Sequence, residues 1–440
     1  VNVNNTNNWM QHLANTTYAD ESRYDMVTRG VPQFYNNVQY RLVLMNYKEA
    51  ARVLETEPLA GISQAQRDNQ LAIVEIMSVL AWSNLVETFG DIPYSQALDA
   101  NKYPTPVYDD GLTIYKDLIV RLNAAIAKLN PSVAGMPTGY DNINPSTPAG
   151  TVKWIKFANA LKLRMGIMLA DKDAAFANTI IEAAAPNVFA AGEKAAMNYS
   201  ASPPNQNQQY IEFVSSGRDD YVVTSRLIDA MQPTNPASDI LTVTVTDPRL
   251  AFYATKLGDV YKGGNYGQTN GYTTSSHVNP INTAPNRAWV IMDYVETEFL
   301  LAEAVERGFN VGGTAETHYN NAVRASILYW GGTAAQADEY MAQPSVAYST
   351  AAGNWKQKIG NQAWLAYYLR GFTAWNSWRR LDYPRLQPVP VPLQNITKVP
   401  VRLLYPVSEQ TLNGENSNAA AAKIGGDSAL TRLFWDTAGY

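Results

Sequence analysis

Residues 287–330 read RAWVIMDYVETEFLLAEAVERGFNVGGTAETHYNNAVRASILYW, and their periodicity predicts two helices that form a hairpin. Apolar residues recur at helical spacing over 291–305 and cover two adjoining faces, which indicates a helix buried on most of its sides. We expect this helix to end at Gly308, and a short glycine-containing link to lead to a second helix capped by Thr314. Pairs of antiparallel helices of this kind are the building units of helical-repeat scaffolds.

Two acidic residues of the first helix, Glu296 and Glu303, are seven positions apart and so lie on roughly the same side. A carboxylate pair could serve acid–base chemistry or hold a metal. However, no histidine or third acid accompanies the pair at ligand spacing. A carboxylate among apolar residues must be paired inside the protein. We therefore predict a structural role, with Arg379 and Arg380 as the expected partners.

The composition is that of a folded chain and excludes several classes of function. The chain has 440 residues, a length that suits one large domain or two ordinary ones. Of these residues, 46% are hydrophobic and 17% are charged, which provides enough apolar side chains for a core. No run of about twenty apolar residues is present, so we expect no bilayer-spanning helix. The net charge of −5 and the lack of a basic cluster argue against a nucleic-acid partner and against an anionic membrane surface.

Cysteine is absent, which excludes disulfides, thiolate metal sites and a cysteine nucleophile. The chain opens VNVNNTNNWM without an initiating methionine or a signal peptide, which indicates a processed or trimmed form. Tyrosine is unusually common, with 27 residues, and tryptophan adds 10. Many aromatic and amide residues in loops are suited to stacking on sugars and to hydrogen-bonding their hydroxyl groups.

Elsewhere the chain alternates between helical and irregular segments. Apolar periodicity predicts further helices over residues 34–54, 63–86, 109–129, 151–170 and 334–341, with a short one ending at 185 and one or two helices over 355–381. Residues 15–30 and 186–286 are rich in turn-forming residues and predict loops, with one alternating strand at 241–247. The Gly-rich segment near Gly264 lacks a preceding strand and a following helix, so it is not a nucleotide loop.

An ordered set of segments resembles a known family. In order along the chain they are LVETFGDIPYSQAL, DYVETEFLLAEAVERGF followed by YNNAVRASILYW, WLAYYLRGFTAWNSWRRLDYP and LYPVSEQTLN. This pattern resembles the SusD/RagB family of Bacteroidetes outer-membrane lipoproteins, the SusD-like branch in particular, over about residues 71–413. The resemblance implies a mostly α fold in which tetratricopeptide-like helix pairs form a right-handed helical scaffold over about 34–185 and 287–384. It also implies a loop-rich, ligand-facing part over about 186–286 and 15–30, within a single domain of residues 1–440.

The resemblance also carries expectations about function. Members are surface-exposed nutrient-binding lipoproteins that act as lids on a TonB-dependent, SusC-like transporter and capture glycans or other nutrients. Their lipid is attached to a cysteine at the mature N-terminus, which this chain lacks. The motifs themselves are scaffold under this reading. We assign no catalytic residue, no metal-ligand residue and no cofactor, and the sequence leaves open whether a calcium ion supports the loops.

We expect the ligand to bind on the loops. The aromatic and polar residues there do not follow the apolar periodicity of a buried helix or strand. We predict a binding surface in which the middle loop faces the N-terminal loop, formed by Tyr18, Arg23, Tyr24, Tyr261, Asn265, Tyr266 and Tyr272. An oligosaccharide is the favoured ligand, because pyranose rings stack on aromatic faces and their hydroxyls bind amide and charged groups. For any single tyrosine, a role in stabilising its own loop is an equally good explanation.

Three alternatives remain at this stage. A peptide or glycopeptide ligand would suit the same loops. A glycoside hydrolase needs only two carboxylates, whose separation is invisible in the sequence, although no zinc-protease, serine-hydrolase or phosphate-loop motif is present. A purely helical adaptor would bind protein partners through its repeats.

Overall fold

The computed structural model describes residues 4–59, 61–234 and 236–437. Contacts within the chain group these residues into two compact units. Unit 1 comprises Met26–Val188 and Val401–Thr437, and unit 2 comprises residues 4–25 and Phe189–Pro400. The single domain expected over residues 1–440 stays a prediction.

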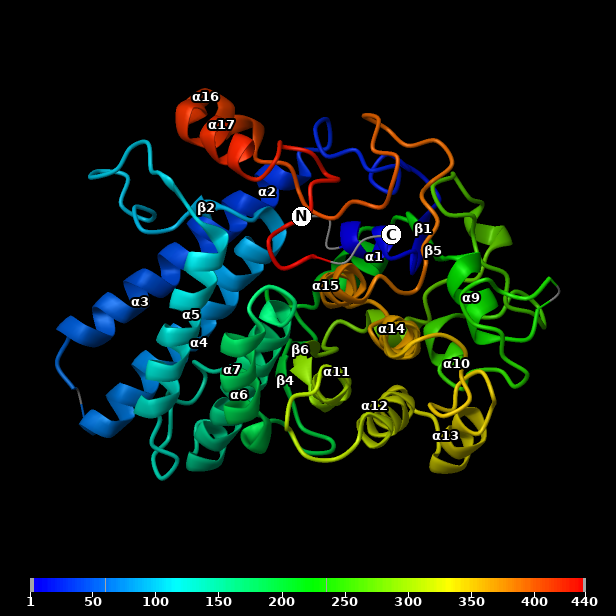
Figure 1. Ribbon diagram of the computed structural model, residues 1–440, viewed down its shortest axis with the longest axis horizontal. Coiled ribbons are helices and arrows are strands. Elements are labelled where there is room, and N and C mark those ends of the chain that lie inside the picture. Colours follow the sequence, from blue (N-terminus) through cyan, green and yellow to red (C-terminus); the bar gives the residue numbers. More distant parts are fainter. Residues whose placement is uncertain (1–3, 60, 235, 438–440) are drawn as a thin grey trace. The chain divides into compact units, whose positions relative to one another are not determined.

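Helices make up nearly all of the regular secondary structure of unit 1 (Figure 1). Its helices are α2 (Val31–Asn37), the π-helical η1 (Val38–Leu44), α3 (Met45–Thr56), α4 (Gln64–Phe89), α5 (Gly111–Lys128), α6 (Pro148–Leu169), α7 (Ala174–Ala184), the 3-10 helix η2 (Ala185–Asn187), α16 (Val407–Leu412) and α17 (Gly414–Lys423). Two short strands, β2 (Ile92–Pro93) and β3 (Tyr108–Asp109), pair antiparallel between α4 and α5.

Helix α4 is the centre of unit 1 and packs against α3, α5 and α6. It begins as the sequence predicts, because the Ser63 hydroxyl accepts a hydrogen bond from the Gln66 amide at 3.2 Å. Among the described residues, it is the one helix long and apolar enough to cross a membrane. Most of it is buried inside unit 1, however, as the central helix of a packed core would be.

Unit 2 combines short strands and turns with a set of paired helices. Its first part contains α1 (Asn5–Trp9), β1 (Leu13–Asn15), β4 (Lys194–Met197), α8 (Gln208–Tyr210), η3 (Ile211–Ser215), β5 (Tyr221–Val223), α9 (Ser225–Met231), α10 (Leu250–Tyr253), η4 (Tyr272–Thr274) and η5 (Pro280–Thr283). Its second part contains β6 (Trp289–Asp293), α11 (Tyr294–Glu306), α12 (Ala315–Trp330), α13 (Ala334–Met341), α14 (Trp355–Ala366) and α15 (Gly371–Leu381). The mostly α fold predicted from the sequence is confirmed.

The predicted hairpin is present as α11 and α12, which pack along each other (Figure 1). Its first helix begins three residues later than predicted, because residues 289–293 form strand β6 and pair antiparallel with β4. The Asp293 carboxylate then accepts a hydrogen bond from the Glu296 amide at 2.9 Å and starts the helix at Tyr294. The strand over 289–293 is fixed by a partner about 95 residues away in the sequence, which local periodicity cannot reveal.

The strand predicted at 241–247 is wrong, because this segment is irregular. Its amide groups bond elsewhere: the amides of Thr244 and Val245 both donate to Gln343 Oε1, at 2.8 and 2.9 Å. The Asp247 amide donates to Met231 O at 2.7 Å. A buried side chain therefore takes the place of a neighbouring strand.

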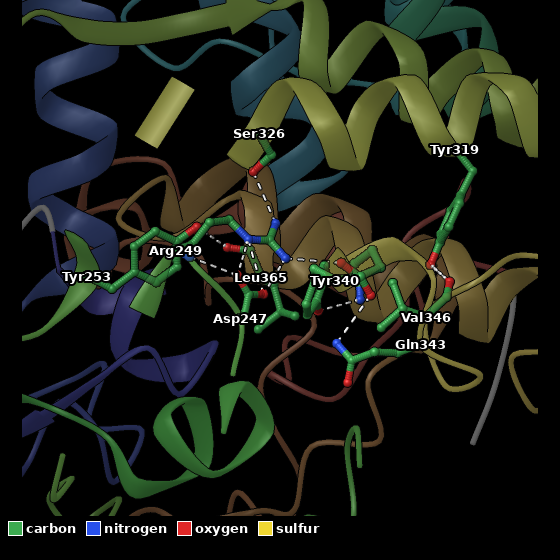
Figure 2. A network of polar contacts seen from close by, with 10 residues as sticks. Asp247, Arg249, Tyr253, Tyr319, Ser326, Tyr340, Gln343, Val346 and Leu365 are labelled. Carbon is green, nitrogen blue, oxygen red and sulfur yellow. Dashed lines mark hydrogen bonds and ion pairs between the residues drawn. The ribbon is translucent and has the colours of Figure 1, made fainter. Parts of the chain in front are cut away.

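A buried polar network holds this irregular segment to the helices of unit 2 (Figure 2). Asp247 and Arg249 form an ion pair at 2.6 Å in which both side chains are fully buried. The Arg249 guanidinium also donates to Ser326 Oγ of α12 and to Gln362 Oε1 of α14, each at 3.1 Å. Tyr253 donates to Leu365 O at 2.8 Å. The network thus joins α10 to two helices of the scaffold.

The pairing of buried acids predicted for the hairpin is confirmed. Glu303 lies 2.9 Å from both Arg380 and Arg307. Glu296 lies 2.5 Å from Arg370, a partner that the sequence analysis had not named. Arg379 instead holds its guanidinium 3.5 Å from the ring centroid of Trp375. The two carboxylates therefore hold α11 to α15 and to Arg370, the residue directly before α15.

Candidate ligand-binding surface

Three segments of unit 2 meet at the predicted ligand-binding loops. Strand β1 pairs with β5 in the register Leu13↔Val223 and Asn15↔Tyr221, which places the residues after Asn15 beside those before Tyr221. The middle loop joins them because Asn270 donates from its amide and from Nδ2 to Asn15 O, at 3.0 and 2.9 Å. The N-terminal loop and the middle loop therefore face each other, with residues 216–220 between them.

Tyr18 is the most exposed of the predicted site residues, with 54% of its surface open to solvent. Its backbone has φ of 50°, in the left-handed region that a tyrosine rarely adopts. The Arg218 guanidinium lies 5.1 Å from the centroid of its ring, and Arg218 is itself held 2.6 Å from Asp220. Thr17 also donates to Asp220, at 2.7 Å. A strained backbone that is held by several contacts around an exposed ring is typical of a functional site.

Tyr272 forms the other side of this surface. Its ring stacks on His277 with the centroids 3.7 Å apart and the planes 12° from parallel. Partial burial raises the pKa of Tyr272, and the nearby charge of Asp219 and its hydrogen bond with the hydroxyl raise it further. We call the group Thr17, Tyr18, Arg218, Asp219, Asp220, Tyr272 and His277 the Tyr18–Tyr272 surface.

The remaining predicted site residues divide into two groups. Tyr261 is partly exposed, with Lys256 Nζ 5.6 Å from its ring centroid, and Asn265 is exposed and donates its amide to Asn270 Oδ1 at 2.6 Å. These two extend the surface along the middle loop. Arg23 donates from Nε to Val391 O at 2.7 Å and so fixes a neighbouring loop.

Tyr24 and Tyr266 are buried, which differs from the platform that the sequence predicts. The Tyr24 hydroxyl accepts a hydrogen bond from the Val389 amide at 3.0 Å. Burial, followed by the neighbouring Tyr24, raises the pKa of Tyr266 well above its ordinary value. Both rings pack inside unit 2, so neither face is open to a ligand in this structure.

The sequence analysis missed Arg218, Asp219, Asp220 and His277. The segment GRDD at 217–220 combines a turn glycine with three charges directly before the apolar run YVV. That pattern indicates an exposed turn, but it does not reveal which other loop packs against the turn. Among the described residues, no group of three or more histidine or acidic side chains is arranged to hold a metal. The surface offers aromatic faces, a guanidinium and carboxylates, which are groups that bind sugars by stacking and hydrogen bonding.

Comparison with known proteins identifies the family. Residues 1–406 match the model of the SusD-like family, which is described as "Starch-binding associating with outer membrane". The chain belongs to this family, whose members are binding proteins associated with the outer membrane. No curated protein sequence matches the chain.

Solved structures share the fold over almost the whole chain. A chitin-binding protein is 26% identical with a TM-score of 0.80, over 98% of this chain and 94% of its own. A chitin-binding SusD homologue from Flavobacterium johnsoniae is 23% identical with a TM-score of 0.81, over 99% and 94%. A SusD homologue from Bacteroides uniformis is 24% identical with a TM-score of 0.82, over 100% and 96%. The tetratricopeptide-like arrangement of the helix pairs agrees with the fold of these structures.

Proposed function

We propose that this protein is a surface-exposed glycan receptor that binds oligosaccharides at the Tyr18–Tyr272 surface and passes them to a TonB-dependent transporter. The observation that carries the proposal is the exposed ring of Tyr18, held in a strained backbone by Arg218 where three loops meet. An aromatic face fixed in place loses little conformational entropy when a sugar stacks on it. Asp219, Asp220 and Arg218 supply acceptors and donors for the sugar hydroxyls.

The relatives indicate which glycans to test first. The family description mentions starch, and two of the similar structures are chitin-binding proteins. Oligomers of glucose and of N-acetylglucosamine are therefore the first ligands to examine. A peptide or glycopeptide ligand is the alternative within the same family, because the charged groups beside Tyr18 and Tyr272 would also suit peptide termini.

Replacing Tyr18 with alanine is expected to weaken oligosaccharide binding about tenfold, which corresponds to the loss of about 1.4 kcal/mol of stacking. Isothermal titration calorimetry with N-acetylglucosamine and glucose oligomers measures the change. Tyr140→Ala is the matched control, because Tyr140 is an 80% exposed tyrosine of unit 1 that is not among the residues of the proposed surface. Equal binding by the wild type and Tyr18→Ala would remove the Tyr18–Tyr272 surface from consideration.

Delivery to a transporter requires a surface for a protein partner, and unit 1 offers one. Apolar side chains are exposed along the helical run of α2, η1 and α3, at Phe34, Leu42, Met45 and Val53. No residue of α3 is buried, although this helix is amphipathic. Exposed apolar side chains along one element are typical of protein interfaces.

Leu42→Asp is expected to reduce co-purification of the protein with a co-expressed SusC-like transporter, because a carboxylate in an apolar interface is costly to desolvate. Leu42 and Val120 are each 63% exposed in unit 1, so Val120→Asp on α5 is the matched control. Quantitative pull-down from detergent extract measures the difference. An equal loss in both variants, or in neither, would count against this face as the interface.

A further inference from the structure

Unit 2 contains a second polar site, a partly enclosed cavity of about 40 Å³. It is lined by α8, η5, β6, α12 and the residues that follow α14, and it shares no residue with the Tyr18–Tyr272 surface. The rings of Trp330 and Tyr368 form part of its apolar wall. A cavity of about 150 Å³ accommodates benzene. This one therefore admits a group of only a few non-hydrogen atoms.

Three side chains that line the cavity each keep one buried polar atom without a hydrogen-bond partner among the described residues. These atoms are Gln209 Nε2, Asn282 Oδ1 and Arg370 Nε. Gln209 is 2% exposed and Asn282 is 1% exposed. Buried polar groups are nearly always paired in folded proteins, so three around one cavity indicate a missing ligand or water.

The chemical character of these atoms is set by their other contacts. Asn282 donates from Nδ2 to Phe252 O at 2.7 Å, so its side-chain oxygen Oδ1 is the atom without a hydrogen-bond partner among the described residues. Arg370 donates from its two terminal nitrogens to Asp293 and Glu296, at 3.0 and 2.5 Å, which leaves the Nε donor. The residues that line the cavity thus keep two donors, from Gln209 and Arg370, and one acceptor, from Asn282, that other described residues do not engage.

The backbone at the cavity is also strained. Leu369, between Tyr368 and Arg370, has φ of 61°, in the left-handed region. A branched side chain in this conformation persists only where the surrounding structure holds it, and such positions cluster at ligand sites. The Arg287 guanidinium lies 5.1 Å from the ring centroid of Trp330 and closes another side of the wall.

We propose that this cavity binds the acetamido group of an N-acetylated sugar, a step that rests on the proposed glycan-binding function. The carbonyl oxygen accepts from Gln209 and Arg370, the amide N–H donates to Asn282 Oδ1, and the methyl group packs against the aromatic wall. A carboxylate would satisfy both donors but would place a negative charge against the Asn282 oxygen. A hydroxyl group would leave the apolar wall without a partner.

The first test separates the amide from its charged analogue without any variant. Acetamide and acetate have the same number of non-hydrogen atoms, so crystals soaked in each compare only the chemistry of the group. We expect acetamide in the cavity, with its oxygen toward Gln209 and Arg370, and no acetate there. Ordered water alone in both crystals, or acetate bound as well as acetamide, would overturn the proposal.

The second test connects the cavity to glycan binding. Gln209→Met removes one donor while keeping the size of the side chain, and we expect it to reduce the preference for triacetylchitotriose over cellotriose about tenfold. Gln208→Met is the matched control, because Gln208 is the exposed neighbour in the same helix. Thermal melting verifies that both variants fold.

The outcomes distinguish this inference from the proposed function. If Tyr18→Ala weakens the binding of both trisaccharides while Gln209→Met leaves the ratio of their affinities unchanged, the proposed receptor function is supported and the assignment of the cavity is wrong. If acetamide occupies the cavity but the wild type binds no oligosaccharide, the proposed function as a glycan receptor is wrong, while the specificity of the cavity for an amide group is supported. Tighter binding of a glutamine-containing peptide than of triacetylchitotriose would overturn the assignment to a sugar.

Discussion

Replacing Arg249 with methionine is expected to lower the free energy of unfolding by about 3–5 kcal/mol, because the change leaves the Asp247 carboxylate buried without its cation. Both side chains of this ion pair are fully buried, so water cannot replace the lost partner. The same substitution removes the hydrogen bonds to Ser326 and Gln362 that join α10 to α12 and α14 (Figure 2). Urea unfolding followed by tryptophan fluorescence measures the effect.

Two controls make this result specific. Arg324→Met breaks the partly exposed pair with Asp338 in the same unit, and we expect a loss of under about 1 kcal/mol. The double variant Asp247→Leu with Arg249→Met removes both charges and is expected to recover part of the stability, since no unpaired charge remains. A loss of under about 1 kcal/mol in Arg249→Met would show that the network does not hold the loop-rich part to the helices.

Replacing Glu303 with glutamine is expected to cost about 3 kcal/mol at neutral pH, because Arg380 and Arg307 would then lose their shared counter-charge. Burial by itself would raise the pKa of Glu303, but the charges of Arg380 and Arg307 and their hydrogen bonds outweigh burial and lower the pKa. Chemical unfolding at several pH values compares the wild type with the variant. Glu316→Gln, on the exposed side of α12, is the control.

The pH dependence of this difference has a definite sign. A carboxyl group whose pKa is lower in the folded state stabilises the protein above its unfolded pKa of about 4.3. That contribution is lost as the pH falls through the folded pKa. The stability of the wild type and of Glu303→Gln should therefore converge in acid and diverge toward neutral pH. A constant difference across this range would mean that the charge of Glu303 does not stabilise the helix pair.

The same geometry argues against Glu296 and Glu303 as the two catalytic carboxylates of a hydrolase. Glu296 and Glu303 are each held by arginines inside unit 2, with their side chains 4% and 0% exposed. A glycosidase needs its two carboxylates on either side of an accessible glycosidic bond. The arrangement of these two is that of structural ion pairs, which agrees with a family of binding proteins.

The helical part of the protein was determined by its sequence to a large extent. The periodicity of 315–330 and 334–341 predicts α12 and α13, and the caps Ser63 and Thr314 lie where the sequence places them. Helical contacts are local, since each backbone bond joins residues four apart and each face repeats every three to four residues. The paired role of Glu303 followed from the same reasoning, because a carboxylate among apolar residues needs a cation.

The candidate ligand site, in contrast, was decided by the tertiary structure. The sequence indicates loops rich in tyrosine, but Tyr18 is exposed while Tyr24, six residues later, is buried. The difference arises from contacts between distant segments, such as the bond from Asn270 to Asn15 and that from Val389 to Tyr24. Arg218 reaches Tyr18 only because β1 pairs with β5. Loops lack an internal repeat of hydrogen bonds, so their conformation depends on partners far away in the chain, and only the folded structure specifies those partners.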